Sequence, residues 1–157
     1  MLGVALALVA AATAANAQEP CKVIVNPANP AVQIQRAAVV AIYLGQMTRC
    51  GDGKPISPVD QSTRAPVRAA FSEKVLRRPI QNVQYYWLRK IAADRSMPPP
   101  AKGSDADVVA YVRANQGAIG YVADGFVVDT SVKVVRVIDD GPDARPATPP
   151  KTPSRDP

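Results

Sequence analysis

The sequence contains no histidine. That absence excludes the Ser-His and Cys-His pairs of nucleophilic catalysis and all metal sites built on imidazole. A Walker phosphate loop, a GxGxxG fingerprint and a CxxC motif are missing as well. The acidic pair Asp139-Asp140 is explained by solvation, and no other pair of carboxylates stands out. We therefore expect a binding protein without enzyme activity, metal or cofactor.

Charged side chains are absent from the first 17 residues, MLGVALALVAAATAANA, an apolar run that ends in Ala15-Asn16-Ala17. This small-x-small ending suits signal peptidase, and the run is shorter than the roughly 20 residues of a membrane span. No lysine or arginine precedes the run, so an uncleaved anchor stays open as the alternative. We predict a signal peptide over residues 1–17, no membrane span after its removal, and a location in the periplasm or outside the cell.

The rest of the chain is long enough for one domain with one core. Its last stretch, 141–157, is rich in proline, charge and small polar residues, which predicts a disordered tail. The folded domain is then 18–140. The formal net charge of +6 is spread along the chain, and no nucleic-acid motif is present. The charge therefore favours small anions or envelope components as partners, and not nucleic acid.

Only two cysteines occur, Cys21 and Cys50. In an exported chain such a pair predicts one disulfide, and two separate buried thiols are the alternative.

Apolar patterning predicts eight main elements. Short β-branched runs indicate strands, and apolar residues at helical spacing indicate helices, with Ser62 or Thr63 and Ser104 as N-caps. The strands are expected at 22–26, 54–59, 118–122 and 132–138, and the helices at 32–46, 63–76, 80–93 and 104–117. The order β-α-β-α-α-α-β-β predicts an α/β domain with a mixed sheet flanked by helices, its first β-α-β being a right-handed parallel unit. Such a unit would place Cys21 and Cys50 at the same end of the domain.

The opposite end of that unit would carry two polar loops, because open α/β sheets bind ligands at the carboxyl ends of parallel strands. The second of these loops runs into a helix N-terminus, whose N–H groups favour anions. Arg64 and Arg68 share one helix face, so both can reach an anion there, although two solvated arginines are the alternative. Arg64 is the stronger candidate because it is closer to the amides. The predicted ligand-binding residues are Asn26, Gln61, Ser62, Thr63, Arg64 and Arg68.

An ordered series of short stretches resembles the periplasmic phosphate-binding-protein-like domain, found in the substrate-binding proteins of phosphate ABC importers. The stretches are IVNPANP, DGKPISPVDQ, RAAFSEKVL, YYW, PPP, SDADVVAYV and GAIGYV. The resemblance covers about residues 23–138 and implies one lobe of a type II periplasmic binding protein. In that family two lobes close around the anion, and this chain is too short for two.

The resemblance also implies a ligand and a partner. In the family, a Ser-Gly-Thr turn at a helix N-terminus and a nearby arginine bind phosphate. The matching turn here, Gln61-Ser62-Thr63-Arg64, keeps the hydroxyls and lacks the glycine. The expected ligand is phosphate or a related small oxyanion, and the expected partner is an ABC permease or another envelope protein.

Two rival functions stay open. One is a ligand-free protein-interaction module of the cell envelope, which a wide exposed apolar patch would favour. The other is an enzyme acting on an anionic envelope substrate, which would need a cleft with perturbed carboxylates. No residue in the sequence points to the enzyme.

Overall fold

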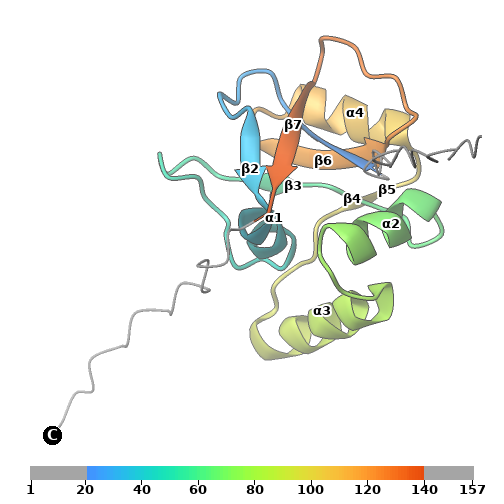
Figure 1. Ribbon diagram of the computed structural model, residues 1–157. Coiled ribbons are helices and arrows are strands. Elements are labelled where there is room, and N and C mark those ends of the chain that lie inside the picture. Colours follow the sequence, from blue (N-terminus) through green and yellow to red (C-terminus); the bar gives the residue numbers. More distant parts are fainter. Residues whose placement is uncertain (1–20, 140–157) are drawn as a thin grey trace, which may run out of the picture.

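The computed structural model describes residues 21–139. The predicted signal peptide, 1–17, and the predicted tail, 141–157, lie outside these residues. The elements are β1 (Cys21–Val25), β2 (Gln33–Gln35), α1 (Arg36–Tyr43), β3 (Ser57–Pro58), β4 (Asp60–Gln61), α2 (Pro66–Lys74), α3 (Ile80–Asp94), β5 (Ala101–Lys102), α4 (Asp105–Ala114), β6 (Ala118–Ala123) and β7 (Lys133–Ile138). The predicted fold class, α/β with a mixed sheet flanked by helices, is confirmed, and three short strands are added to the expected order (Figure 1).

The main sheet has the strand order β2-β7-β1-β6-β3. The central strand β1 runs antiparallel to both of its neighbours, β6 and β7. The outer strands β3 and β2 run parallel to β6 and β7 respectively. Strands β4 and β5 form a separate parallel pair beside this sheet.

Side chains of β1 and β6 alternate between two apolar layers, as the two-residue period of a strand requires. Val23 and Tyr121 belong to the layer that contains the buried residues of α1, α2 and α3. Ile24 and Val122 belong to the opposite layer, which contains the buried valines of α4. Because both faces of β1 are covered at its second half, residues 23–25 are consecutive apolar residues and do not alternate with polar ones.

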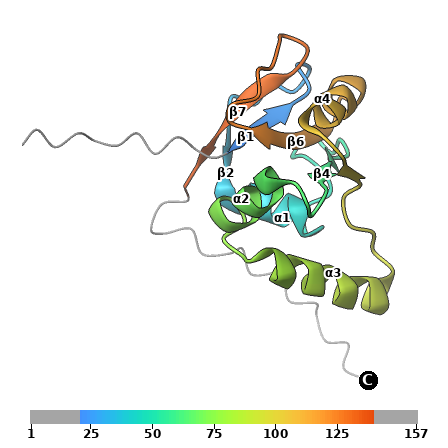
Figure 2. The ribbon, with the colours of Figure 1, turned by 90° about the vertical axis from the view of Figure 1, so that its right-hand side faces the viewer.

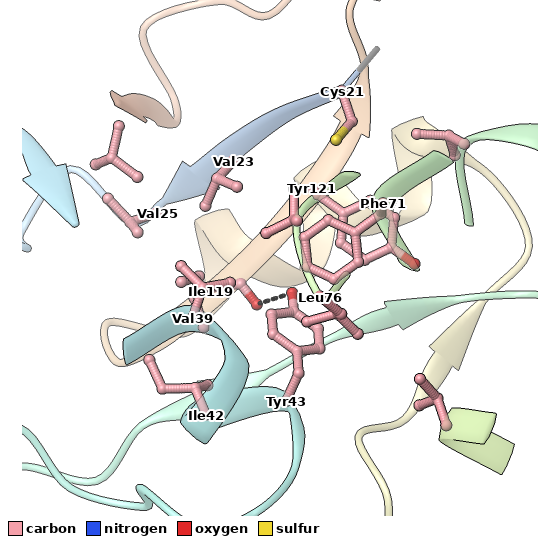
Figure 3. Packing of buried hydrophobic residues seen from close by; sticks show 14 of the residues in the cluster. Cys21, Val23, Val25, Val39, Ile42, Tyr43, Phe71, Leu76, Ile119 and Tyr121 are labelled. Carbon is pink, nitrogen blue, oxygen red and sulfur yellow. Dashed lines mark hydrogen bonds between the residues drawn. The ribbon is translucent and has the colours of Figure 1, made fainter. Parts of the chain in front are cut away.

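Helix α2 is fixed to the sheet by aromatic packing. Phe71 of α2 stacks on Tyr121 of β6, with ring centroids 3.8 Å apart and planes 2° from parallel. Tyr43 of α1 meets the edge of Phe71 at a centroid distance of 4.8 Å. Figure 3 shows these three rings at the end of β1 that begins with Cys21. The packing therefore holds the start of α2 close to β6, where the candidate site lies.

Helix α4 lies very close to β6, and Gly120 permits this approach. A Cβ atom at Gly120 would lie 2.7 Å from a methyl group of Val108 and 2.8 Å from one of Val59. Both distances are shorter than van der Waals contact, and both valines are completely buried. A larger residue at Gly120 would force α4 away from the sheet.

Helix α3 is poorly covered. Only Val83 and Trp87 of its 15 residues are buried, although Tyr85 and Leu88 are large side chains exposed by 63% and 66%. Figures 1 and 2 show α3 at the edge of the molecule, with α2 between it and the sheet. One long side of α3 is thus open to a ligand or partner.

The predicted parallel β-α-β unit is wrong. Strand β6 lies between β1 and β3, antiparallel to the first and parallel to the second, so β1 and β3 run in opposite directions. The handedness rule applies only to parallel strands, and β6 follows β1 in sequence by more than 90 residues. A pairing at such a distance leaves no local signal near β1.

The predicted disulfide fails for the same reason. Cys21, at the start of β1, is opposite Ala123. Cys50 lines the same pocket as Val25, and Val25 is the last residue of β1. No disulfide joins the two cysteines within residues 21–139. Cys21 is buried and Cys50 is exposed, so the alternative of two buried thiols fits only Cys21.

Two predicted helices begin later than expected. The first starts at Arg36, because residues 33–35 pair with β7 as strand β2. Helix α2 starts at Pro66 with Ala65 as its N-cap, so Ser62 and Thr63 belong to the preceding loop. The Ser104 cap of α4 is confirmed, since its hydroxyl accepts a hydrogen bond from the Asp107 amide at 3.2 Å. Among residues 21–139, no helix has the length and apolarity that a membrane crossing requires.

Candidate functional site

A cleft of about 860 Å³ lies between the loop that leads into α2 and one side of α3. Its lining is divided by chemistry. The polar side chains come from β4, β5, α2 and the loop before α2, whereas α3 contributes mainly apolar side chains. The polar side chains of the lining are those of Asp60, Gln61, Ser62, Thr63, Arg68 and Lys102, together with Gln84 from α3.

The parallel pair of β4 and β5 builds the polar part of the cleft. Asp60 and Gln61 are in register with Ala101 and Lys102. The pairing continues for one more residue, because the Ser62 amide donates to the Lys102 carbonyl at 2.9 Å. The chain then turns, with the Ala65 amide donating to the Ser62 carbonyl at 2.9 Å, and α2 begins. Two short strands therefore fix where the hydroxyl-bearing loop lies.

Arg68 is the most unusual residue of the cleft. Its side chain is only 4% exposed, and its Nε atom lies 2.9 Å from Oδ1 of Asp60. The contact is an ion pair without a well-directed hydrogen bond, since neither Nε nor Nη1 makes one to any described residue. A buried guanidinium with unused donors is costly, because each lost hydrogen bond to water has to be replaced. Nε faces Asp60, whereas Nη1 is left without an acceptor among the described residues.

Asp60 lies at the centre of a hydrogen-bond network. Its Oδ1 atom accepts hydrogen bonds from the Tyr121 hydroxyl and from the Gln61 amide, the latter at 2.8 Å. Burial raises the pKa of the Asp60 carboxyl above its usual value, and Arg68 and the two donors pull it back only partly. Burial next to Asp60 also raises the pKa of Tyr121, so the phenol stays a donor. The network holds the Asp60 carboxylate in a largely buried position beside the Arg68 guanidinium.

The side chain of Gln61 has a structural role. Its Nε2 atom donates to Oδ1 of Asp105 at 2.6 Å and to the Tyr121 carbonyl at 3.0 Å. Gln61 is 3% exposed. With both amide protons used, Gln61 contributes to the shape of the cleft, and Ser62 and Thr63 are the neutral side chains of the loop that can donate to a ligand.

The structure brings four of the six predicted ligand-binding residues together: Gln61, Ser62, Thr63 and Arg68 all line the cleft. Arg64 is exposed on the loop and lies outside this lining, whereas Arg68 lies within it. Asn26 lies at the other end of the sheet, where its Nδ2 atom donates to the Val112 and Arg113 carbonyls, each at 3.0 Å. Asn26 was misplaced because β1 was expected to be parallel to the strand before this loop.

The charges of the cleft suit a small anion. Arg68 and Lys102 supply two positive charges, and Asp60 supplies one negative charge. The N-terminus of α2, which is the positive end of the helix dipole, follows shortly after Ser62 and Thr63. The site contains hydroxyls and cations but no imidazole. Within residues 21–139, no cluster of three or more metal-binding side chains occurs. Non-covalent binding of an oxyanion is the chemistry that these groups perform best.

Several lining residues were absent from the predicted set, among them Asp60, Lys102 and Trp87. The sequence does contain one signal for Asp60: Arg68 precedes the apolar Phe71 by three residues. That spacing puts the arginine on the buried face of α2, where it needs a carboxylate. Lys102 and Trp87 come from distant segments, and no local pattern links them to the loop.

Comparison with known proteins gives a likeness of fold. No family model matches the chain, and no curated protein matches its sequence. Solved structures do match. One is a protein from Clostridium perfringens described as a phosphate ABC transporter substrate-binding protein and solved with bound phosphate, with a TM-score of 0.61 and 21% identity over 75% of this chain and 44% of that one.

Two further solved structures have a similar fold. An ABC-type phosphate transport receptor from Vibrio cholerae has a TM-score of 0.56 and 23% identity, over 75% of this chain and 46% of its own. PstS from Borrelia burgdorferi has a TM-score of 0.56 and 10% identity, over 75% of this chain and 47% of its own. This chain has the fold of one lobe of a phosphate-binding protein. It spans less than half the length of these phosphate-binding proteins, and at such identities the likeness concerns the fold alone.

Proposed function

We propose that this chain is an exported, single-lobe protein that binds phosphate or a related oxyanion non-covalently in the cleft before α2, in the periplasm or outside the cell. One observation carries the proposal: Arg68, only 3% exposed, lines the cleft, and its Nη1 atom has no hydrogen-bond partner among the described residues. The fold likeness to proteins described as phosphate receptors supports it. Export rests on the sequence of residues 1–17.

In the proposed complex, each side chain has a distinct role. Arg68 provides charge and the donors directed at the anion, and the Ser62 and Thr63 hydroxyls complete the donor set. Asp60 orients Arg68 and, through its second oxygen, accepts a hydrogen bond from the hydroxyl of a protonated phosphate. A fully ionised sulfate has no such proton, so Asp60 would favour phosphate over sulfate. Lys102 adds positive charge at the rim of the cleft.

The test is an amide NMR titration of the purified protein with phosphate, sulfate and chloride. We expect saturable shifts confined to residues 60–68 and 101–103, larger affinity for phosphate than for sulfate, and no saturation with chloride. Ser62→Ala with Thr63→Val should weaken phosphate binding by about tenfold, the value of one or two lost hydrogen bonds. Arg89→Ala, which removes a positive charge from α3 outside the cleft, is the matched control and should leave binding unchanged. Equal, unsaturable responses to all three salts would refute the proposal.

A second candidate is a ligand-free interaction module that docks on another envelope protein, such as an ABC permease. The exposed Tyr85, Leu88 and Met97 at and after α3 favour it. If no oxyanion binds in the titration, this alternative becomes the leading one. Enzyme activity has no support, since the structural neighbours are described as transport receptors and substrate-binding proteins.

A further inference from the structure

The cleft offers much more than a place for an inorganic ion. Its volume of about 860 Å³ lies within the range of about 300–1,000 Å³ typical of sites for whole organic molecules. A phosphate ion beside Arg68 and Thr63 would fill only the polar end. The remaining space lies against α3.

The α3 side of the cleft is mainly apolar, with Gln84 as its one polar side chain. Val83, Trp87, Leu88 and Ile91 of α3 and Pro98 of the following segment line it. Leu88 and Ile91 are exposed by 66% and 38%, an unusual concentration of uncovered apolar surface next to a cationic site. Trp87, by contrast, is 8% exposed and held in place by packing. The cleft thus has an anion-binding end and an apolar wall, facing the same space.

We propose that the ligand of this cleft is a phosphate ester with an alkyl or aryl group, and not inorganic phosphate; this inference rests on the proposed oxyanion function. The phosphate group lies at Arg68, Ser62 and Thr63, and the organic group covers Leu88 and Ile91. The two ends of the ligand match the two ends of the cleft: one needs charge-assisted hydrogen bonds, and the other removes apolar surface from water.

The experiment compares inorganic phosphate with n-butyl phosphate, using 1-butanol as the uncharged control. Trp87 is the only tryptophan in the chain and lines the cleft, so its fluorescence reports the alkyl group directly. We expect butyl phosphate to bind at least tenfold more tightly than phosphate and to change the Trp87 emission in a saturable way. Tenfold corresponds to about 1.4 kcal/mol, less than the burial of a butyl chain yields. Butanol alone should produce no saturable signal.

Two exposed positions on α3 supply matched variants. Leu88→Gln removes apolar surface inside the cleft, whereas Tyr85→Gln does so at an equally exposed position outside it. Leu88→Gln should reduce the preference for butyl phosphate by about threefold to tenfold and leave phosphate binding intact. Tyr85→Gln should change neither.

The outcomes separate this inference from the proposed function. Saturable phosphate binding with equal or weaker binding of butyl phosphate would overturn the ester inference and leave the oxyanion site standing. Loss of the butyl preference in Tyr85→Gln but not in Leu88→Gln would also overturn it. Absence of binding for both anions would refute the proposed function and the ester inference together.

Discussion

The pairing of Arg68 with Asp60 gives the sharpest test of the site. Replacing Arg68 with methionine keeps an unbranched stem in place of the aliphatic part of the side chain and removes the guanidinium, which leaves Asp60 ionised where its side chain is only 16% exposed. Breaking one partner of a buried pair costs about 3–5 kcal/mol. Because Asp60 keeps the Tyr121 and Gln61 donors, we expect the lower end, a loss of about 3 kcal/mol in the free energy of unfolding at pH 7.

The loss should depend on pH and on Asp60. Burial raises the folded-state pKa of Asp60, and Arg68 opposes that rise. For a carboxyl with a raised folded-state pKa, stability falls as the pH rises from the ordinary carboxyl pKa through the raised one. Without Arg68 this fall becomes larger, so Arg68→Met should be closest to the wild type in acid. Adding Asp60→Asn removes the stranded charge and should recover about 2 kcal/mol at pH 7.

Urea unfolding followed by Trp87 fluorescence measures these differences, with Arg89→Met as the control for loss of an exposed cation. We expect the control to lie within about 0.5 kcal/mol of the wild type. A single variant Arg68→Met as stable as the wild type at pH 7 would show that the pair carries no energetic coupling. The same conclusion would follow if the double variant were no more stable than Arg68→Met.

Further predictions test the fold and the site. Gly120→Ala should destabilise the protein by about 1–3 kcal/mol in urea unfolding, because the added methyl overlaps two buried valines; an unchanged midpoint would contradict the close packing of α4. Ser104→Ala should cost about 1 kcal/mol by loss of the α4 cap, measured in the same assay, whereas Ser104→Thr should cost less. In the native protein one thiol, that of Cys50, should react quickly with a thiol reagent while the buried Cys21 reacts only on unfolding; no reactive thiol in either state would indicate a disulfide. Sulfate affinity should rise as the pH falls through the titration of Asp60, because protonation removes the negative charge beside Arg68, and Asp60→Asn should abolish this dependence in a calorimetric titration.

Local signals in the sequence were sufficient for most elements. The β-branched runs of β1, β6 and β7, the periodicity of α3 and the Ser104 cap of α4 lie within the segments that they define. Segments of this kind form their structure from near neighbours, so their residues carry the information. The hydroxyl-bearing loop at Ser62 and Thr63 was identified on the same grounds, by its position before a helix.

Long-range pairing could not be predicted. The insertion of β6 between β1 and β3 reverses the direction of one strand relative to the other. That single error moved Asn26 into the predicted site and brought Cys21 and Cys50 to one end of the domain. The burial of Arg68 was missed for a related reason: its partner Asp60 precedes it by eight residues, and only the folded loop brings the two together.

Arg68 also favours one of the two proposed functions, the anion site. An interaction module would use the exposed apolar side chains of α3, and a buried guanidinium with unused donors contributes nothing to such a surface. A buried ion pair is weak evidence for stability, since well-packed neutral residues are often as stable. If the double variant of Asp60→Asn and Arg68→Met folds with nearly wild-type stability, the pair is dispensable for the fold. Its presence beside two hydroxyls in the cleft would then favour the proposed anion site over a purely structural role.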